Sequence, residues 1–175
     1  MTIVPVMAKD PSPPNPHTHT IVFLHGRGDN AVSLQTASWF DVWDVRDFAS
    51  LEDLQTEGLR EVVPEICDLL AREAAALGGR YDRVVLAGIS MGAATGAHVL
   101  FNLDILAAAG GRLGAFIGFS GRCPFSGRSL TEMRKTLGLG DAPSHDNVIR
   151  KTPMLLEHCV DDPVVTKEWM MSSGF

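Results

Sequence analysis

A serine lies between two glycines in the segment Gly88-Ile89-Ser90-Met91-Gly92. An apolar run precedes this segment and small residues follow it, so we expect a buried strand that passes through a sharp turn into a closely packed helix. At such a turn the residues two before and two after the serine must lack side chains. The spacing therefore predicts Ser90 as a nucleophile at the carboxyl end of a sheet, with Gly88 and Gly92 as the elbow glycines.

Backbone N–H groups near Ser90 could stabilise the negative charge that develops on a carbonyl oxygen under attack. One candidate is the N–H of Met91, at the start of the predicted helix. The second is the N–H of Arg27, in the glycine-rich loop His25-Gly26-Arg27-Gly28-Asp29. The residues alone leave open the alternative that these glycines only form a turn. His25 is predicted to orient this loop rather than to act as a base.

The elements that must position these residues follow from the hydrophobic pattern. Apolar positions from Val63 to Leu77 recur at intervals of three and four, which predicts a helix that ends at Gly78-Gly79 and begins or kinks at Pro64. Short, continuous apolar runs predict strands that are buried on both faces. They cover residues 19–24, 83–88, 114–119 and 153–158. Strands separated by helices predict an α/β fold with a mostly parallel sheet and helices on both faces.

Beyond the serine segment, several stretches resemble the acyl-protein thioesterase, or phospholipase/carboxylesterase, family of α/β-hydrolases. The resemblance implies a single α/β-hydrolase domain over residues 1–175, of which 1–16 are an extended, proline-rich segment. It also implies cleavage of carboxylic esters or thioesters through an acyl-Ser90 intermediate, without a metal or organic cofactor. The substrates would be acylated proteins, small acyl esters or lysolipids. The matching stretches are residues 19–29, Trp39-Phe40-Asp41, Gly88-Ile89-Ser90-Met91-Gly92, Phe119-Ser120-Gly121, Thr152-Pro153-Met154-Leu155 and Asp162-Pro163-Val164-Val165.

The family's catalytic acid lies in an Asp-Pro segment after a late strand, and this position falls on Asp162. Asp161 is the neighbouring alternative. In a Ser-His-Asp arrangement such a carboxylate orients the imidazole and stabilises its charged form.

Two parts of the family pattern have no counterpart. The family's catalytic histidine follows one more strand after the aspartate, and none of the six histidines matches it. A segment with another core strand is also missing between the loop at 25–29 and Trp39. We therefore expect an incomplete fold, and the alternative function is a catalytically impaired or truncated hydrolase-like domain that acts at most as a binding module. His158 and His25 are the first candidates for a replacement base.

Composition excludes other classes of function. A formal charge of −6 offers no basic face for nucleic acid. The three cysteines form no C-x-x-C pair, so neither a zinc site nor a disulfide framework is expected. Neither glycine-rich loop is a nucleotide-binding motif. Without a secretion signal or a long apolar run, a cytoplasmic protein is expected, and its oligomeric state is left open.

Overall fold

The computed structural model describes residues 7–28, 38–42, 44, 47, 50–159 and 161. Its strands are β1 (Thr20–Leu24), β2 (Val84–Ile89), β3 (Ala115–Phe119) and β4 (Met154–Glu157). Its α-helices are α1 (Gln55–Ala76), α2 (Met91–Asn102), α3 (Leu130–Leu137) and α4 (Asn147–Lys151). Three short 3-10 helices are η1 (Glu52–Leu54), η2 (Tyr81–Arg83) and η3 (Ala107–Ala109). All four predicted strands are present, with bounds within one residue of those expected.

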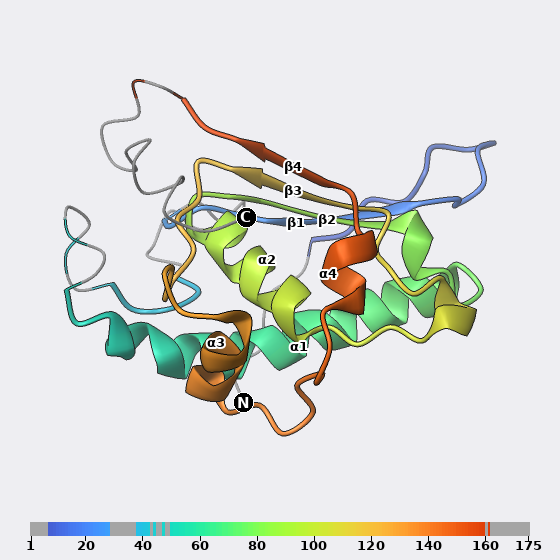
Figure 1. The fold of residues 1–175 in the computed structure, drawn as a ribbon. Helices are drawn as coiled ribbons and strands as arrows, with labels where there is room; N and C mark the ends of the chain where they lie inside the picture. Colours follow the sequence, from blue (N-terminus) through green and yellow to red (C-terminus); the bar gives the residue numbers. More distant parts are fainter. Residues whose placement is uncertain are drawn as a thin grey trace.

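The four strands form one sheet in the order β1-β2-β3-β4, and every neighbouring pair is parallel (Figure 1). The predicted parallel α/β fold is confirmed. Because all strands run in one direction, their carboxyl ends meet at a single edge of the sheet, and the loops that follow β1, β2, β3 and β4 are brought together there.

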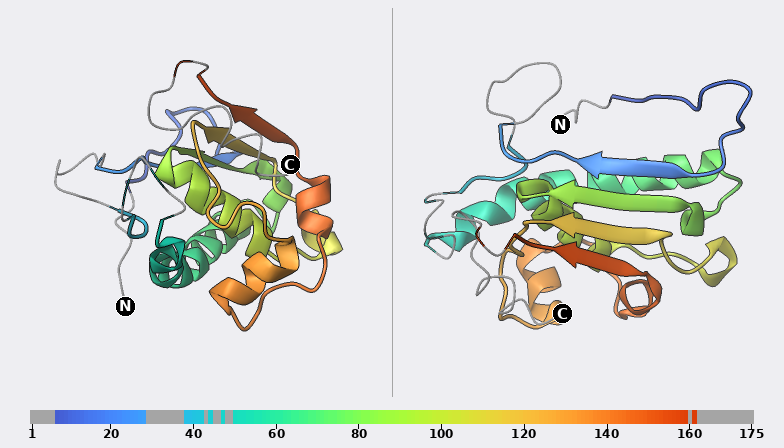
Figure 2. Two further views of the ribbon diagram at one scale, coloured as in Figure 1. Left: turned by 60° about the vertical axis from the view of Figure 1, so that its left-hand side comes forward. Right: turned by 90° about the horizontal axis from the view of Figure 1, so that it is seen from above.

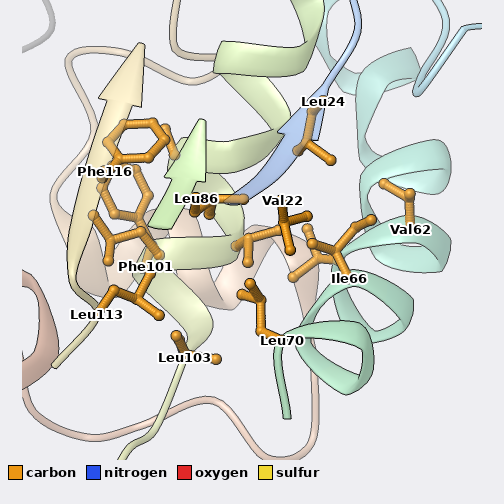
Figure 3. Packing of buried hydrophobic residues seen from close by; sticks show 14 of the residues in the cluster. Val22, Leu24, Val62, Ile66, Leu70, Leu86, Phe101, Leu103, Leu113 and Phe116 are labelled. Carbon is orange, nitrogen blue, oxygen red and sulfur yellow. The ribbon is translucent and has the colours of Figure 1, made fainter. Parts of the chain in front are cut away.

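The core lies between the sheet and the helices. Val22, Leu86 and Phe116 are register partners on β1, β2 and β3, and they face α1 and α2. Figure 3 shows Ile66 and Leu70 of α1 close to Val22. The described helices pack on this face only (Figures 1 and 2).

The opposite face of the sheet differs from the expectation of helices on both faces. Side chains alternate along a strand, so Ile21 and Phe23 point away from α1 and keep exposed fractions of 69% and 56%. Leu155 on β4 is 51% exposed. The strands therefore have the composition of strands buried on both sides, while no helix in the described ranges covers this second side.

Helix α1 begins at Gln55 and runs through Pro64 without ending there. Proline lacks the N–H that would bond to the Arg60 carbonyl. Both residues are exposed, so the proline lies on the solvent side of the helix. The helix ends as predicted: Gly78 and Gly79 have φ values of 73° and 81°, and the Gly79 N–H donates to the Ala74 carbonyl at 2.8 Å.

Helix α3 lies in the Gly/Ser/Arg-rich segment 120–146 between β3 and β4, where the hydrophobic pattern predicts no particular helix. Its start is fixed by a capping box: Ser129 Oγ accepts from the Glu132 N–H, and Glu132 Oε2 accepts from the Ser129 N–H at 2.8 Å. Ser129 and Glu132, three residues apart, were the signal that could have identified it.

No helix in the described part of the chain combines the length and the apolar character needed to cross a lipid bilayer.

Candidate functional site

Ser90 occupies a strained turn between β2 and α2. Its φ of 53° and ψ of −121° lie outside the regions that residues with a side chain normally adopt, at a cost of roughly 1–3 kcal/mol. Backbone hydrogen bonds hold it there, since its N–H donates to the Phe119 carbonyl at 2.8 Å and its carbonyl accepts from the Ala94 N–H at 3.1 Å. The predicted strand, turn and helix are thus present around the serine.

The two flanking glycines lie where side chains have no room. A Cβ on Gly88 would lie 2.5 Å from the carbonyl carbon of Gly92. A Cβ on Gly92 would overlap the carbonyl oxygen of Leu24 and lie 2.5 Å from that of His25. The first turn of α2 is therefore pressed against the ends of both β1 and β2. This packing brings the loop after β1 to the serine.

Two backbone segments meet at Ser90. The Met91 N–H belongs to the first turn of α2, whose N–H groups have no partner within the helix. On the other side, a Cβ on Gly26 would lie only 3.6 Å from Ser90 Cβ, so the chain passes directly beside the serine before reaching Arg27. Arg27 is exposed, and Gly28 has a φ of 76°. Met91 thus directly follows Ser90, and Arg27 follows the glycine that passes beside it, so both candidate oxyanion donors stay predictions close to Ser90 in the chain path.

His25 and Trp39 support the loop after β1. Their rings lie 4.6 Å apart between centroids, and Trp39 Nε1 donates to the His25 carbonyl at 2.8 Å. His25 Nδ1 lies 2.6 Å from the Gly26 carbonyl oxygen. These contacts suit the expected loop-orienting role of His25.

The predicted catalytic acid is the part of the candidate site about which the structure says least. Asp162 lies outside the described residues, and Asp161, its alternative, is exposed. The adjacent strands β2, β3 and β4 end in register at Ile89, Phe119 and Glu157. The residues that directly follow these three therefore lie next to one another at one edge of the sheet. They are Ser90, Ser120 and His158. Two strand spacings place the His158 backbone about 10 Å from Ser90.

His98 is enclosed in the core. Its side chain is 0% exposed, its Nε2 lies 3.1 Å from the Pro124 carbonyl oxygen, and its ring packs edge-on against Phe101 and Phe125. Desolvation by this burial lowers the pKa of His98 from 6.5 to about 4, against a smaller raising effect of the Pro124 carbonyl. His98 is therefore neutral at pH 7 and belongs to the core.

The buried imidazole predicts a pH-dependent stability. The unfolded chain takes up this proton near pH 6.5 and the folded chain only near pH 4, so the part of the folding stability that depends on His98 should be constant well above pH 6.5 and fall between these values by roughly 3 kcal/mol. Urea unfolding at pH 7.5 and pH 4.5 measures the loss. His98→Gln, which does not titrate in this range, should lose less stability than the wild type over this interval. An equal loss in both proteins would contradict the assignment.

An ion pair anchors the loop after β3. Arg122 Nη2 lies 2.8 Å from Glu52 Oε1, and the side chains are only 6% and 16% exposed. The same oxygen accepts from the Phe125 N–H at 2.7 Å. The sequence pattern does not predict this pair, because 70 positions separate the partners.

The cysteines show no activated thiol in the core. All three are free, and burial raises the pKa of Cys67 and of Cys123 to about 12, so both remain protonated at neutral pH. Among the described residues no three histidines, cysteines or carboxylates are grouped as metal ligands.

Comparison with known proteins agrees with this geometry. Acyl-protein thioesterase 1 of Yarrowia lipolytica is 24% identical over 183 residues, covering 85% of this chain and 71% of the relative. SOBER1 of Arabidopsis thaliana superposes with a TM-score of 0.64 at 21% identity, covering 89% of this chain and 80% of that one. Acyl-protein thioesterase 2 of Zea mays gives a TM-score of 0.62 at 24% identity, with 93% and 79% covered. The two structures establish a shared fold.

A family model carries the assignment further than these pairwise similarities, because it matches most of the chain. The model describes phospholipases and carboxylesterases and matches residues 34–173, from the segment before Trp39 past the strand β4. The parallel sheet, the turn at Ser90 and this match agree, and the chain belongs to the Phospholipase/Carboxylesterase family of α/β-hydrolases.

Proposed function

We propose that this chain is a serine hydrolase of carboxylic esters or thioesters that works through an acyl-Ser90 intermediate. The observation that carries the proposal is the strained turn of Ser90, which backbone hydrogen bonds hold at the sheet edge, at the start of α2. A strained backbone maintained by its surroundings is typical of active sites.

Each residue of the proposed site has its own role in the reaction. Ser90 Oγ attacks the acyl carbon and loses its proton to a base, and the alcohol or thiol leaves with a proton as the acyl-serine forms. Water then attacks the acyl-serine, releasing the carboxylic acid and restoring the hydroxyl. The N–H groups of Met91 and Arg27 donate to the oxyanion in both steps. Asp162 orients an imidazole, for which His158 and His25 are the candidates at this edge.

The substrate class rests on the relatives. Two of the similar proteins are named acyl-protein thioesterases. We extend this to acylated proteins, including palmitoylated ones, and to lysophospholipids or small acyl esters, and we assign the enzyme to the cytoplasm. Nucleic acid is not a partner under this proposal, because the chain carries a formal charge of −6.

The alternative is a non-catalytic hydrolase-like domain. It is favoured by one observation: none of the six histidines of the sequence stands at the position of the family's catalytic histidine. A serine hydroxyl without an adjacent base is a weak nucleophile at neutral pH.

Labelling with a fluorophosphonate separates the two functions. A serine hydrolase should be labelled at Ser90, and it should hydrolyse p-nitrophenyl acetate at least about a thousandfold faster than the Ser90→Ala variant. Ser120→Ala is the matched control, since Ser120 ends the adjacent strand, also with a positive φ, of 46°. The control should keep both the labelling by the probe and the hydrolysis of the ester. A folded wild-type chain that is neither labelled nor active would establish the non-catalytic alternative.

A further inference from the structure

We propose that the cavity between α1, the end of α2 and the loop after α3 binds the ammonium group of a small aliphatic amine. The cavity has a volume of about 360 Å³, within the range of about 300–1,000 Å³ that is usual for small-molecule sites. The proposal does not depend on the hydrolase activity. It rests on a buried acceptor that has no partner among the described residues, on the charges that line the cavity and on its apolar wall.

The cavity lies far from the candidate active site. Asn102 ends α2, whereas Ser90 directly precedes its first residue, so the length of the helix, about 18 Å, separates the two. The helices α1, α2 and α3 pack against one another (Figure 1). The residues that line the cavity come from α1, η2, the end of α2 and the loop after α3, and every one of them belongs to the described ranges.

Asn102 supplies a buried hydrogen-bond acceptor at this cavity. It is only 8% exposed and belongs to the lining. Its Nδ2 donates to the His98 carbonyl at 2.8 Å, so the amide nitrogen is committed to the helix. Its Oδ1 is buried and has no hydrogen-bond partner in the described part of the chain. Because an amide oxygen only accepts and a buried acceptor without a donor destabilises the fold, an N–H group of a ligand would satisfy this position.

The charges that line the cavity are all negative. Asp68, Asp104 and Asp141 come from α1, from the chain after α2 and from the loop after α3, and no lysine, arginine or histidine of the described ranges joins them in the lining. Burial raises the pKa of Cys67 to about 12 and also raises that of Tyr81, with the charge of Asp68 as a smaller cause in both, so these two groups stay neutral. The carboxyl end of α2 adds a partial negative charge. The cavity therefore favours a cation.

The arrangement suits an organic cation better than a metal ion. The three carboxylates do not converge as metal ligands, since no such group of three occurs among the described residues. Val63, Leu103 and Leu139 give the cavity an apolar wall on which a hydrocarbon stem can pack. A primary aliphatic amine combines what the cavity requires: N–H donors for Asn102, a positive charge for the carboxylates and an apolar stem for the wall.

Isothermal titration calorimetry on the full 175-residue chain tests the assignment with three ligands that share one stem. Pentylamine should bind saturably. Pentanol, which has no charge, and pentyltrimethylammonium, which has no N–H donor, should bind at least about tenfold more weakly, because each lacks part of a charge-assisted hydrogen bond. The titration is run at pH 8, since His145 lies 3.7 Å from Asp104 and competes for its charge when it is protonated.

Two pairs of variants locate the binding. Asn102→Leu should weaken pentylamine binding at least about tenfold, because it removes the acceptor. Thr95→Val is the matched control: Thr95 is buried in the same helix and donates to the Met91 carbonyl four residues earlier, but it does not line the cavity. Asp141→Asn should weaken binding about two- to fivefold, whereas Asp53→Asn, at a carboxylate that is 89% exposed and outside the cavity, should leave it unchanged.

Equal binding of pentanol and pentylamine would overturn the proposal, as would an equal loss in Asn102→Leu and Thr95→Val. Absence of saturable binding by the folded wild type would do the same. Circular dichroism checks that each variant is folded, and if Asn102→Leu does not fold, the three ligands and the aspartate pair still decide. None of these results depends on Ser90, so failure here leaves the proposed function intact.

Discussion

Gly92→Ala is expected to destabilise the fold severely. The new Cβ would overlap the carbonyl oxygen of Leu24 and lie 2.5 Å from that of His25. Both oxygens belong to the backbone at the end of β1, which is held by its ladder with β2, so neither can move aside as a flexible side chain would. Overpacking usually costs about 1–3 kcal/mol, and a backbone clash lies at or above the upper end of that range.

Thermal unfolding measures this effect. We expect a fall in Tm on the order of 10 °C, since 1 kcal/mol corresponds to about 2–4 °C in a chain of this size. Gly140→Ala is the control, because a Cβ there meets nothing within 4 Å and the φ is not positive. The control should stay within about 0.5 kcal/mol of the wild type. A Gly92→Ala protein with wild-type Tm would show that α2 does not approach β1 this closely.

Glu52→Ala is the second substitution from which we expect a large loss of folding stability. The substitution leaves the Arg122 guanidinium, only 6% exposed, without its carboxylate, and it removes the acceptor of the Phe125 N–H. Removing one partner of a buried ion pair typically costs about 3–5 kcal/mol. The loop between β3 and α3 should loosen together with η1.

A double-mutant cycle tests this coupling in urea. Arg122→Met combined with Glu52→Ala should be more stable than the sum of the single effects predicts, because both single substitutions remove the same ion pair. Asp53→Ala is the matched control from the next position: Asp53 is 89% exposed and lies 3.6 Å from Arg128, so little change is expected. Strict additivity of Glu52 and Arg122 would contradict the coupling.

Local pattern was sufficient to predict the four strands and the turn at Ser90. Gly88, Ser90 and Gly92 have fixed spacing, and steric exclusion acts between residues near in sequence. Parallel pairing follows from helices that connect buried strands. The end of α1 at Gly78-Gly79 depends equally on local backbone geometry.

The features that local pattern did not predict depend on tertiary position. Pro64 is tolerated within α1 because it lies on the solvent side, which depends on how the helix packs. The Glu52–Arg122 pair joins segments that only the fold brings together. The residue types of Ile21 and Phe23 predict buried side chains. Their observed exposure depends instead on what covers that face of the sheet, which is a matter of tertiary structure.

Helix α2 and the loop after β1 both contribute residues to the candidate site. The two segments differ in local stability. All twelve residues of α2 are buried. Amide hydrogens in such an enclosed helix exchange only when much of the molecule opens, whereas an edge strand and a glycine-rich loop exchange through small local openings. Ser90 and Met91 therefore belong to the last segment to open, and Arg27 to one of the first. Under the proposed function, the nucleophile would therefore stay in place while its candidate second oxyanion donor moves with the loop after β1.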